Sequence, residues 1–278
     1  MRRRAGAGPV KAGIAAVVVL LVAGAGISTV SAAGGNPVKT HPAPRLFSQA
    51  QIAPLAQVLA AQKPSADRAF ASWVATHQGR DDAAFTSFAL GQVPPPPDAR
   101  TQQAELAELR QLAAARTAAG LDAAAWLEVY GKKDVWKLYV GDAVELAPDT
   151  VKTADKAAFK NTTSLAQSLA GTAEKRFARH SPGEVDPSLR KGLTRRARPS
   201  YPSKHAVDVY AELTLLRAMD PGRTGEFQQM ADEVAYSRLY SAGHFRSDLV
   251  AGAFLGYLVG DYEVHLMHLP ASAPSELE

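Results

Sequence analysis

The sequence predicts an all-α fold, a single helical bundle domain preceded by an N-terminal segment of different character. Apolar residues recur at intervals of three and four over most of the chain, which is the spacing of one face of an α-helix. Proline and glycine gather in short segments that separate these stretches, and no run alternates apolar and polar residues as a β-strand would. At 278 residues with 46% hydrophobic content, the chain is long enough to bury one good-sized core.

Residues 1–33 have the composition of a targeting segment. Three arginines at positions 2–4 precede a dense apolar run at 14–23, and the small residues at 30–32 resemble a cleavage site. The dense run is short for a transmembrane helix, yet no charge occurs in 12–38, so a cleaved signal peptide and an uncleaved membrane anchor both remain open. In either case we expect the protein to be secreted or held in the cell envelope, with a membrane contacted only through this segment.

The charge balance outside this segment points to no polyanionic partner. Residues 1–33 carry four basic and no acidic residues, so removing them leaves 31 − 4 = 27 basic against 27 acidic residues. A net charge of zero gives no general reason to expect nucleic acid. The basic cluster in 190–198 has no interleaved aromatic residues, so we expect a solvated loop or the rim of a phosphate site. The chain has no cysteine and therefore no disulfide.

The domain plan begins with a linker at 34–49 that is rich in glycine and proline, and the helical domain is expected over 50–270 with a tail at 271–278. A first helix is predicted at 65–77, where a serine can cap it and Phe70, Trp73 and Val74 share one face.

Four consecutive prolines at 94–97 exclude a helix or a central strand. The next stretch, 102–119, is rich in helix-favouring residues and carries leucines at helical spacing. Residues 123–130 and 135–146 continue the pattern with short breaks.

The second half of the domain is expected to contain four more helices. One spans 164–179, with a proline shortly after its end, and a proline- and glycine-rich loop follows at 181–202. The remaining three are predicted at 203–219, 225–240 and 244–262. Their apolar runs are interrupted by charges or are too short to span a bilayer.

Two short motifs carry the residue types that phosphoryl transfer to a histidine requires. Ser203 is a natural N-cap, so Lys204 and His205 fall in the first turn of a helix, whose amides and positive dipole end suit an anion. Further on, His244 and Asp248 are one helical turn apart, so the carboxylate can hold one ring nitrogen and leave the other to attack phosphorus.

These motifs resemble those of a known superfamily. Residues 237–248 read Ser-Arg, five residues, His, three residues, Asp, which is the third signature of the phosphatidic acid phosphatase type 2 and vanadium haloperoxidase superfamily. Residues 202–205 match three of the four letters of its second signature, Pro-Ser-Gly-His. The resemblance extends over about residues 95–262 and is greatest to the soluble class A type bacterial acid phosphatases.

The resemblance implies a role for each matching residue. His244 would be the nucleophile that forms a phosphohistidine, Asp248 would orient it, and His205 would be the acid for the leaving group. Arg238 and Ser203 would bind phosphate. The resemblance implies no metal and no cofactor, and vanadate would act as a mimic of the transferred phosphate.

The first family signature, Lys, six residues, Arg-Pro, has two competing placements. One uses Lys191 and Arg198 as phosphate-binding cations but lies unusually near residue 202. The other has the expected spacing and ends a predicted helix, but places Glu174 where lysine belongs and Ser181 where arginine belongs. We favour the second slightly, and in that case Lys204, which replaces the signature glycine, either restores a charge to the phosphate pocket or fills it.

The sequence therefore predicts an exported, metal-independent phosphomonoesterase that acts on a small phosphorylated substrate. Two alternatives remain. One is a vanadate-dependent haloperoxidase, which would use the same site. The other is a pseudophosphatase that binds a phosphorylated ligand without turnover, because substitutions at three signature positions weaken the cation set.

Overall fold

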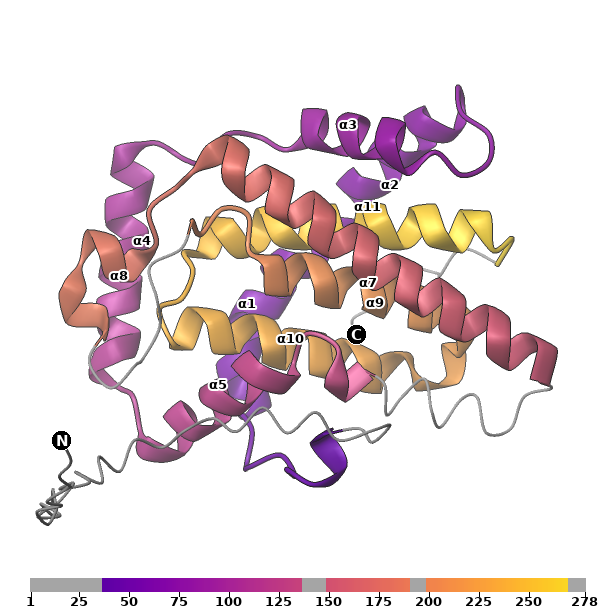
Figure 1. Ribbon diagram of the computed structural model, residues 1–278. Coiled ribbons are helices and arrows are strands. Elements are labelled where there is room, and N and C mark those ends of the chain that lie inside the picture. The colour runs from indigo at the N-terminus through magenta and orange to yellow at the C-terminus, as the bar shows by residue number, and fades with distance from the viewer. Residues whose placement is uncertain (1–36, 137–148, 191–198, 270–278) are drawn as a thin grey trace, which may run out of the picture. The chain divides into compact units, whose positions relative to one another are not determined.

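The computed structural model describes residues 37–136, 149–190 and 199–269, and within 149–154 only the backbone. In the part of the chain that it describes, every regular element is a helix (Figure 1), as the sequence predicts. The α-helices are α1 (Gln49–Ala60), α2 (Lys63–Val74), α3 (Asp82–Gln92), α4 (Ala99–Ala114), α5 (Ala118–Tyr130), α7 (Asp149–Phe177), α8 (Pro182–Val185), α9 (Lys204–Met219), α10 (Thr224–Tyr240) and α11 (Arg246–Leu266). Three short 3₁₀ helices are η1 (Pro37–Lys39), η2 (Pro187–Arg190) and η3 (Pro221–Arg223).

Helix α9 is the centre of the bundle. Its residues from His205 to Ala218 are all buried, and α7, α10 and α11 pack along it (Figure 1). A helix that is covered on all sides needs apolar or internally paired side chains all round. Helix α9 nevertheless carries Lys204, Asp208, Glu212 and Arg217, and the first three of these charged residues are considered below.

Three glycines let α9 and α11 approach closely. Gly252, Gly256 and Gly260 follow one another at intervals of four residues on the face of α11 that meets α9. A Cβ atom at Gly252 would lie 2.6 Å from the Cβ of Ala206 and 2.8 Å from the carbonyl oxygen of Ser203. Both distances are shorter than real Cβ contacts, so the spacing of the two helices depends on the absence of these side chains.

The N-terminal helices complete the core. Helices α1 and α2 pack on α11, and α1 also contacts α10. Within the segment expected as a linker, Val38 and Phe47 are buried, and the amide of Phe47 donates a hydrogen bond to Glu233 of α10 at 3.1 Å. The segment before α1 is therefore anchored to the bundle at Phe47.

Helix boundaries follow the sequence closely in the C-terminal half and less closely before it. The helices predicted at 203–219 and 225–240 are confirmed, and α11 begins two residues later than predicted and ends four residues later. The prediction of one helix over 102–119 is wrong, because Thr117 accepts the amide of Gly120 and caps a new helix, α5.

Two further differences concern α7 and the first helices. Helix α7 begins well before the predicted 164, since residues 149–163 contain no proline or glycine to stop it. Helices α1 and α3 were not predicted. Most of the predicted helix at 135–146 lies outside the described residues, as do the leader at 1–33 and the tail.

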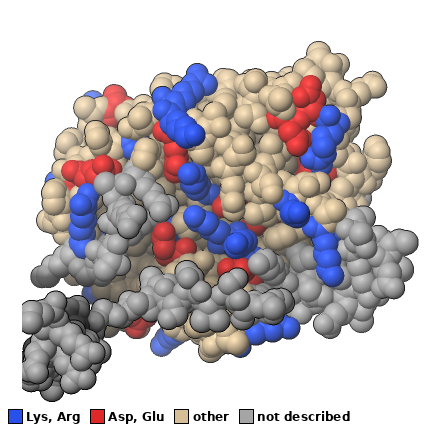
Figure 2. Space-filling view, in the orientation of Figure 1, with Lys and Arg blue, Asp and Glu red and all other residues tan. Residues whose placement is uncertain are grey.

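The described surface carries both charge signs. Figure 2 shows acidic and basic side chains interspersed on the described part of one face, without a large area of either sign. Among the helices of the described residues, none is both long enough and apolar enough to cross a bilayer.

Candidate active site

The first turns of α9 and α11 meet, and this junction forms the centre of the predicted site. The amide of Ser203 donates to the carbonyl oxygen of Asp248 at 2.9 Å, which ties the start of α9 to the start of α11. The hydroxyl of Ser203 accepts the amide of Ala206 at 3.4 Å and so caps α9, as predicted. The close packing at Gly252 lies one turn further along the same contact.

His244 is placed by a tight turn that follows α10. The amides of Gly243 and His244 both donate to the carbonyl oxygen of Arg238, at 2.9 and 3.3 Å. The imidazole Nδ1 of His244 lies 2.8 Å from the carbonyl oxygen of Ser200. A carbonyl oxygen only accepts, so Nδ1 carries the proton and the lone pair of the neutral ring is on Nε2.

Asp248 is fully buried, and its carboxylate contacts Arg179 and the Phe245 amide more closely than it contacts His244. Its Oδ1 atom lies 2.6 Å from Nη1 of Arg179, and its Oδ2 atom accepts the amide of Phe245 at 2.8 Å. The distance from Oδ2 to Nδ1 of His244 is 3.7 Å, which is longer than a hydrogen bond. Burial raises the pKa of Asp248 to about 7, while Arg179 and the Phe245 amide act in the opposite direction.

Arg238 and His205 meet at the last turn of α5. The guanidinium of Arg238 has no exposed surface and donates to the carbonyl oxygen of Ala124 at 2.8 Å, and its Nη1 pairs with the carboxylate of Glu128. Burial lowers the pKa of Arg238 to about 9. The Nε2 atom of His205 lies 3.3 Å from the main-chain carbonyl oxygen of Glu128, so this nitrogen carries a proton in that contact.

Of the three positions at which the favoured placement departs from the signatures, two contact each other. The Nζ atom of Lys204 lies 2.6 Å from Oε2 of Glu174 on α7. Ser181 donates its amide and its hydroxyl to Glu184, at 2.8 and 2.7 Å, and so begins α8. Lys191 and Arg198 lie outside the described residues.

Comparison with protein families identifies the family of the chain. A model of the PAP2 superfamily matches residues 123–269. The chain belongs to the PAP2 superfamily. Membership implies phosphatase-like activity in general terms, and no curated protein matches the chain.

The PAP2 match begins later than the resemblance read from the sequence, which started near residue 95. Helices α1 to α4 therefore lie outside the matched segment. They nevertheless belong to the same core, and Glu105 of α4 contacts Ser247 next to the predicted site.

Sequence reasoning missed three residues that contact the predicted site: Arg179, Glu105 and Glu128. Each is a charged residue that touches a predicted site residue or its immediate neighbour. Arg179 stands two residues before a substituted signature position. Glu105 is a buried carboxylate on the otherwise apolar face of α4, but only the fold shows what it contacts.

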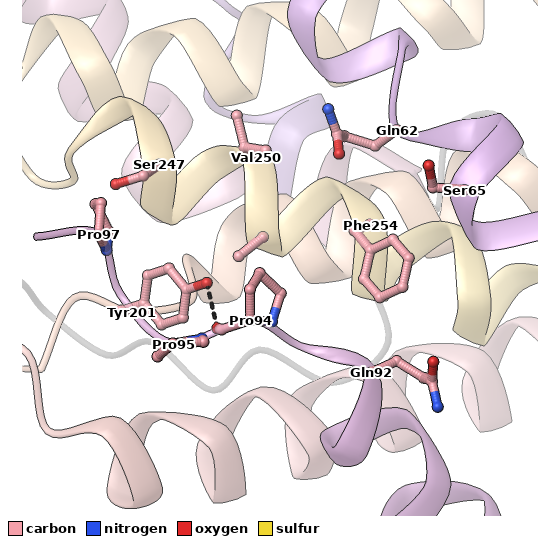
Figure 3. Close-up of a pocket in the computed structure, with 11 residues that line it drawn as sticks. Gln62, Ser65, Gln92, Pro94, Pro95, Pro97, Tyr201, Ser247, Val250 and Phe254 are labelled. Carbon is pink, nitrogen blue, oxygen red and sulfur yellow. Dashed lines mark hydrogen bonds between the residues drawn. The ribbon is translucent and has the colours of Figure 1, made fainter. Parts of the chain in front are cut away.

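A separate apolar pocket lies beside the predicted site. It has a volume of about 360 Å³ and lies between the proline segment, the start of α2 and the face of α11 that carries Val250 and Phe254 (Figure 3). Tyr201 is one of the lining residues and donates from its hydroxyl to the carbonyl oxygen of Pro94 at 2.8 Å. None of the predicted site residues lines this pocket. Among the described residues, no group of three or more His, Asp or Glu side chains is arranged to hold a metal.

Proposed function

We propose that this protein is an exported phosphomonoesterase of the PAP2 superfamily, most similar to the class A type acid phosphatases, and that it works through a phosphohistidine at His244. The leader at 1–33 is the reason for proposing export. The small phosphorylated substrate is bound without a metal.

The hydrogen bond from Nδ1 of His244 to the carbonyl oxygen of Ser200 supports this proposal most strongly. It holds the ring in one orientation and in the tautomer whose Nε2 lone pair is nucleophilic. A histidine that served only to fill the core would not need a fixed tautomer next to a buried arginine and an N-terminal helix turn. Arg238 and the first amides of α9 supply positive charge to the same region.

The proposed reaction has two steps. In the first, Nε2 of His244 forms a bond to phosphorus, the bond from phosphorus to the ester oxygen breaks, and protonated His205 gives its proton to the leaving oxygen. In the second, water attacks phosphorus, neutral His205 takes a proton from that water, and the phosphorus–nitrogen bond breaks to release phosphate. Both histidines return to their starting states.

Hydrolysis of an aryl phosphate by the purified full-length protein tests the proposal, without added metal and at about pH 4 to 8, a range that brackets the ordinary histidine pKa of about 6.5. We expect vanadate-sensitive turnover that is lost in His244→Ala and strongly reduced in His205→Ala. Acid-labile phosphate bound to the wild-type protein but not to His244→Ala would identify the intermediate. Equal turnover in the wild type and His244→Ala would refute the proposal.

A second candidate, a protein that binds a phosphorylated ligand without turnover, is favoured by one specific observation. Arg238 is paired with Glu128, and Lys204 is paired with Glu174, so carboxylates already contact both described cations proposed for phosphate. Binding of inorganic phosphate or vanadate with no hydrolysis of any phosphomonoester would favour this function.

A further inference from the structure

Arg179 lies at the end of α7 and points into the bundle. Ala178, just before it, has a φ of 45°, a left-handed conformation that ends the helix and turns the chain. The side chain of Arg179 is 5% exposed. Its guanidinium carbon lies 4.0 Å from the centroid of the Phe245 ring, a cation–π geometry that holds the guanidinium plane in place.

The guanidinium of Arg179 joins two buried carboxylates from different helices. Nη1 donates to Oδ1 of Asp248 at 2.6 Å and to Oγ of Ser247 at 2.7 Å. Nη2 lies 3.1 Å from Oε2 of Glu105 on α4. With one positive charge between two carboxylates, Arg179 is not placed to bind a phosphate group.

The main chain of Arg179 reaches His244 by a second route. Its carbonyl oxygen accepts the amide of Ser200 at 2.9 Å, and the carbonyl oxygen of Ser200 accepts Nδ1 of His244 at 2.8 Å. The hydroxyl of Ser200 donates to the carbonyl oxygen of His180 at 3.4 Å, and Ser200 acts to lower the pKa of Asp248. Arg179 is thus connected to Asp248 through its side chain and to His244 through its main chain and Ser200.

Glu105 anchors the same unit from α4. Its carboxylate accepts the amide of Ser247 at 2.7 Å and the hydroxyl of Ser247 at 2.9 Å, besides contacting Arg179. The amide of Ser247 belongs to the first turn of α11, where helix amides lack partners within the helix. Glu105 therefore holds the start of α11 and the guanidinium together.

We infer that Arg179, held by Glu105, is the positioning residue of this site and fixes both the Asp248 carboxylate and the imidazole of His244. The expected effect of Arg179 on turnover rests on the proposed function. The expected effect of Arg179 on the orientation of the His244 ring does not.

Arg179→Lys is a specific test because it keeps the positive charge and removes the planar guanidinium. An ammonium cannot present the planar fork that contacts Asp248, Ser247 and Glu105 together. Without the fork, Asp248 loses its nearest cation, and the segment at Arg179 and Ser200 loses its side-chain link to the start of α11 while it keeps its main-chain hydrogen bonds. The imidazole of His244 then samples more than one orientation.

The experiment compares wild type, Arg179→Lys, Glu105→Gln and the matched control Arg176→Lys. Arg176 is an exposed arginine near the end of the same helix, bonded to the carbonyl oxygen of Leu90. The first readout is the Nδ1 proton signal of His244 in protein with ¹⁵N-labelled histidine. The chain has 7 histidines, and the His244→Ala spectrum identifies the signal. The second readout is kcat, KM and the pH profile for an aryl phosphate.

We expect Arg179→Lys to shift or broaden the His244 signal, to lower kcat at least tenfold with KM changed less than threefold, and to move the pH profile. Glu105→Gln should produce smaller changes of the same kind, and Arg176→Lys none. Circular dichroism checks that each variant is folded.

An unchanged His244 signal in folded Arg179→Lys and Glu105→Gln overturns the inference, whatever the activity. A shifted signal in a protein whose wild type has no turnover supports the positioning role and counts against the proposed phosphatase function instead. The two hypotheses therefore fail separately.

Discussion

Lys204 and Glu174 form an ion pair between the first turn of α9 and α7, with 2.6 Å from Nζ to Oε2. With the placement of the first signature that we favour, the superfamily pattern has glycine at position 204 and lysine at position 174, so the cation would lie on the other helix in this chain. The two substitutions therefore form one arrangement rather than two separate losses.

A charge swap tests whether the two positions depend on each other. We expect Glu174→Lys and Lys204→Glu each to lower the free energy of unfolding, because each places like charges together, and the double variant to recover much of the loss. Since the Lys204 side chain is 34% exposed, the coupling is expected to be only about 1 kcal/mol. Urea unfolding of the four proteins measures it. Strictly additive effects would show that the pair contributes no coupling.

Glu128 contacts the arginine that the proposed function assigns to phosphate. A bound phosphate must displace the Glu128 carboxylate from Arg238 or lie beside it at an electrostatic cost. We expect Glu128→Gln to tighten binding of phosphate or vanadate by about five- to tenfold, equivalent to roughly 1 kcal/mol. Titration calorimetry at pH 7 measures this directly.

Asp122→Asn is the matched control for Glu128→Gln. Asp122 is an exposed acid on the same helix, so its removal changes the net charge equally without touching Arg238. An equal gain in both variants would mean that only net charge matters. Weaker binding in Glu128→Gln would mean that the carboxylate organises the pocket instead of competing for it.

Gly252 is expected to tolerate no side chain. A Cβ atom would meet the Ser203 carbonyl at 2.8 Å and force α9 and α11 apart, so Gly252→Ala should lower stability by about 1–3 kcal/mol and reduce turnover. Gly225 on α10 is the control, because nothing lies within 4 Å of a Cβ there. Gly225→Ala should be neutral or slightly stabilising. Thermal unfolding and aryl phosphate hydrolysis compare them, and equal behaviour of the two variants would contradict the close-packing argument.

Two buried carboxyl groups on α9 predict how stability depends on pH. Burial raises the pKa of Asp208 to about 8, against the effects of Lys132, Gln167 and Lys204, and the nearby Glu174 raises it further. Burial and the charge of Asp208 raise the pKa of Glu212 well above its ordinary value. The folded protein thus keeps protons that the unfolded chain releases above about pH 4.

Because the folded state binds more protons, the free energy of unfolding should fall as the pH rises from about 4 to 8. Asp208→Asn removes one of these groups, so the drop in Tm between pH 5 and pH 8 should become smaller. Raised carboxyl pKa values at Asp248, Glu233 and Asp261 keep part of the dependence. Calorimetric Tm values at several pH values test this, and an unchanged dependence in Asp208→Asn would show that Asp208 is not a protonated buried group.

Helices were predicted correctly where a capping residue and a helix-ending turn mark their two ends in the sequence. Helix α9 was predicted well because Ser203 caps its start and an Asp-Pro-Gly turn ends it. The stretch 102–119 was misread because its composition favours helix throughout, and the break depends on the cap at Thr117 and its contact with Tyr240. Helices α1 and α3 were not predicted although each has a local start signal, a Ser48–Gln51 capping box for α1 and the Asp81 cap for α3.

The sequence by itself determined the helical class, the superfamily pattern and the residue types at the site, because these depend on short-range spacing and on which side chains can perform phosphoryl transfer. Only the tertiary structure decided the partner of each polar group. The pairs Arg179–Asp248, Arg238–Glu128 and Lys204–Glu174 each join separate elements. In a buried site every charge must find such a partner, and which one it finds depends on how the helices pack.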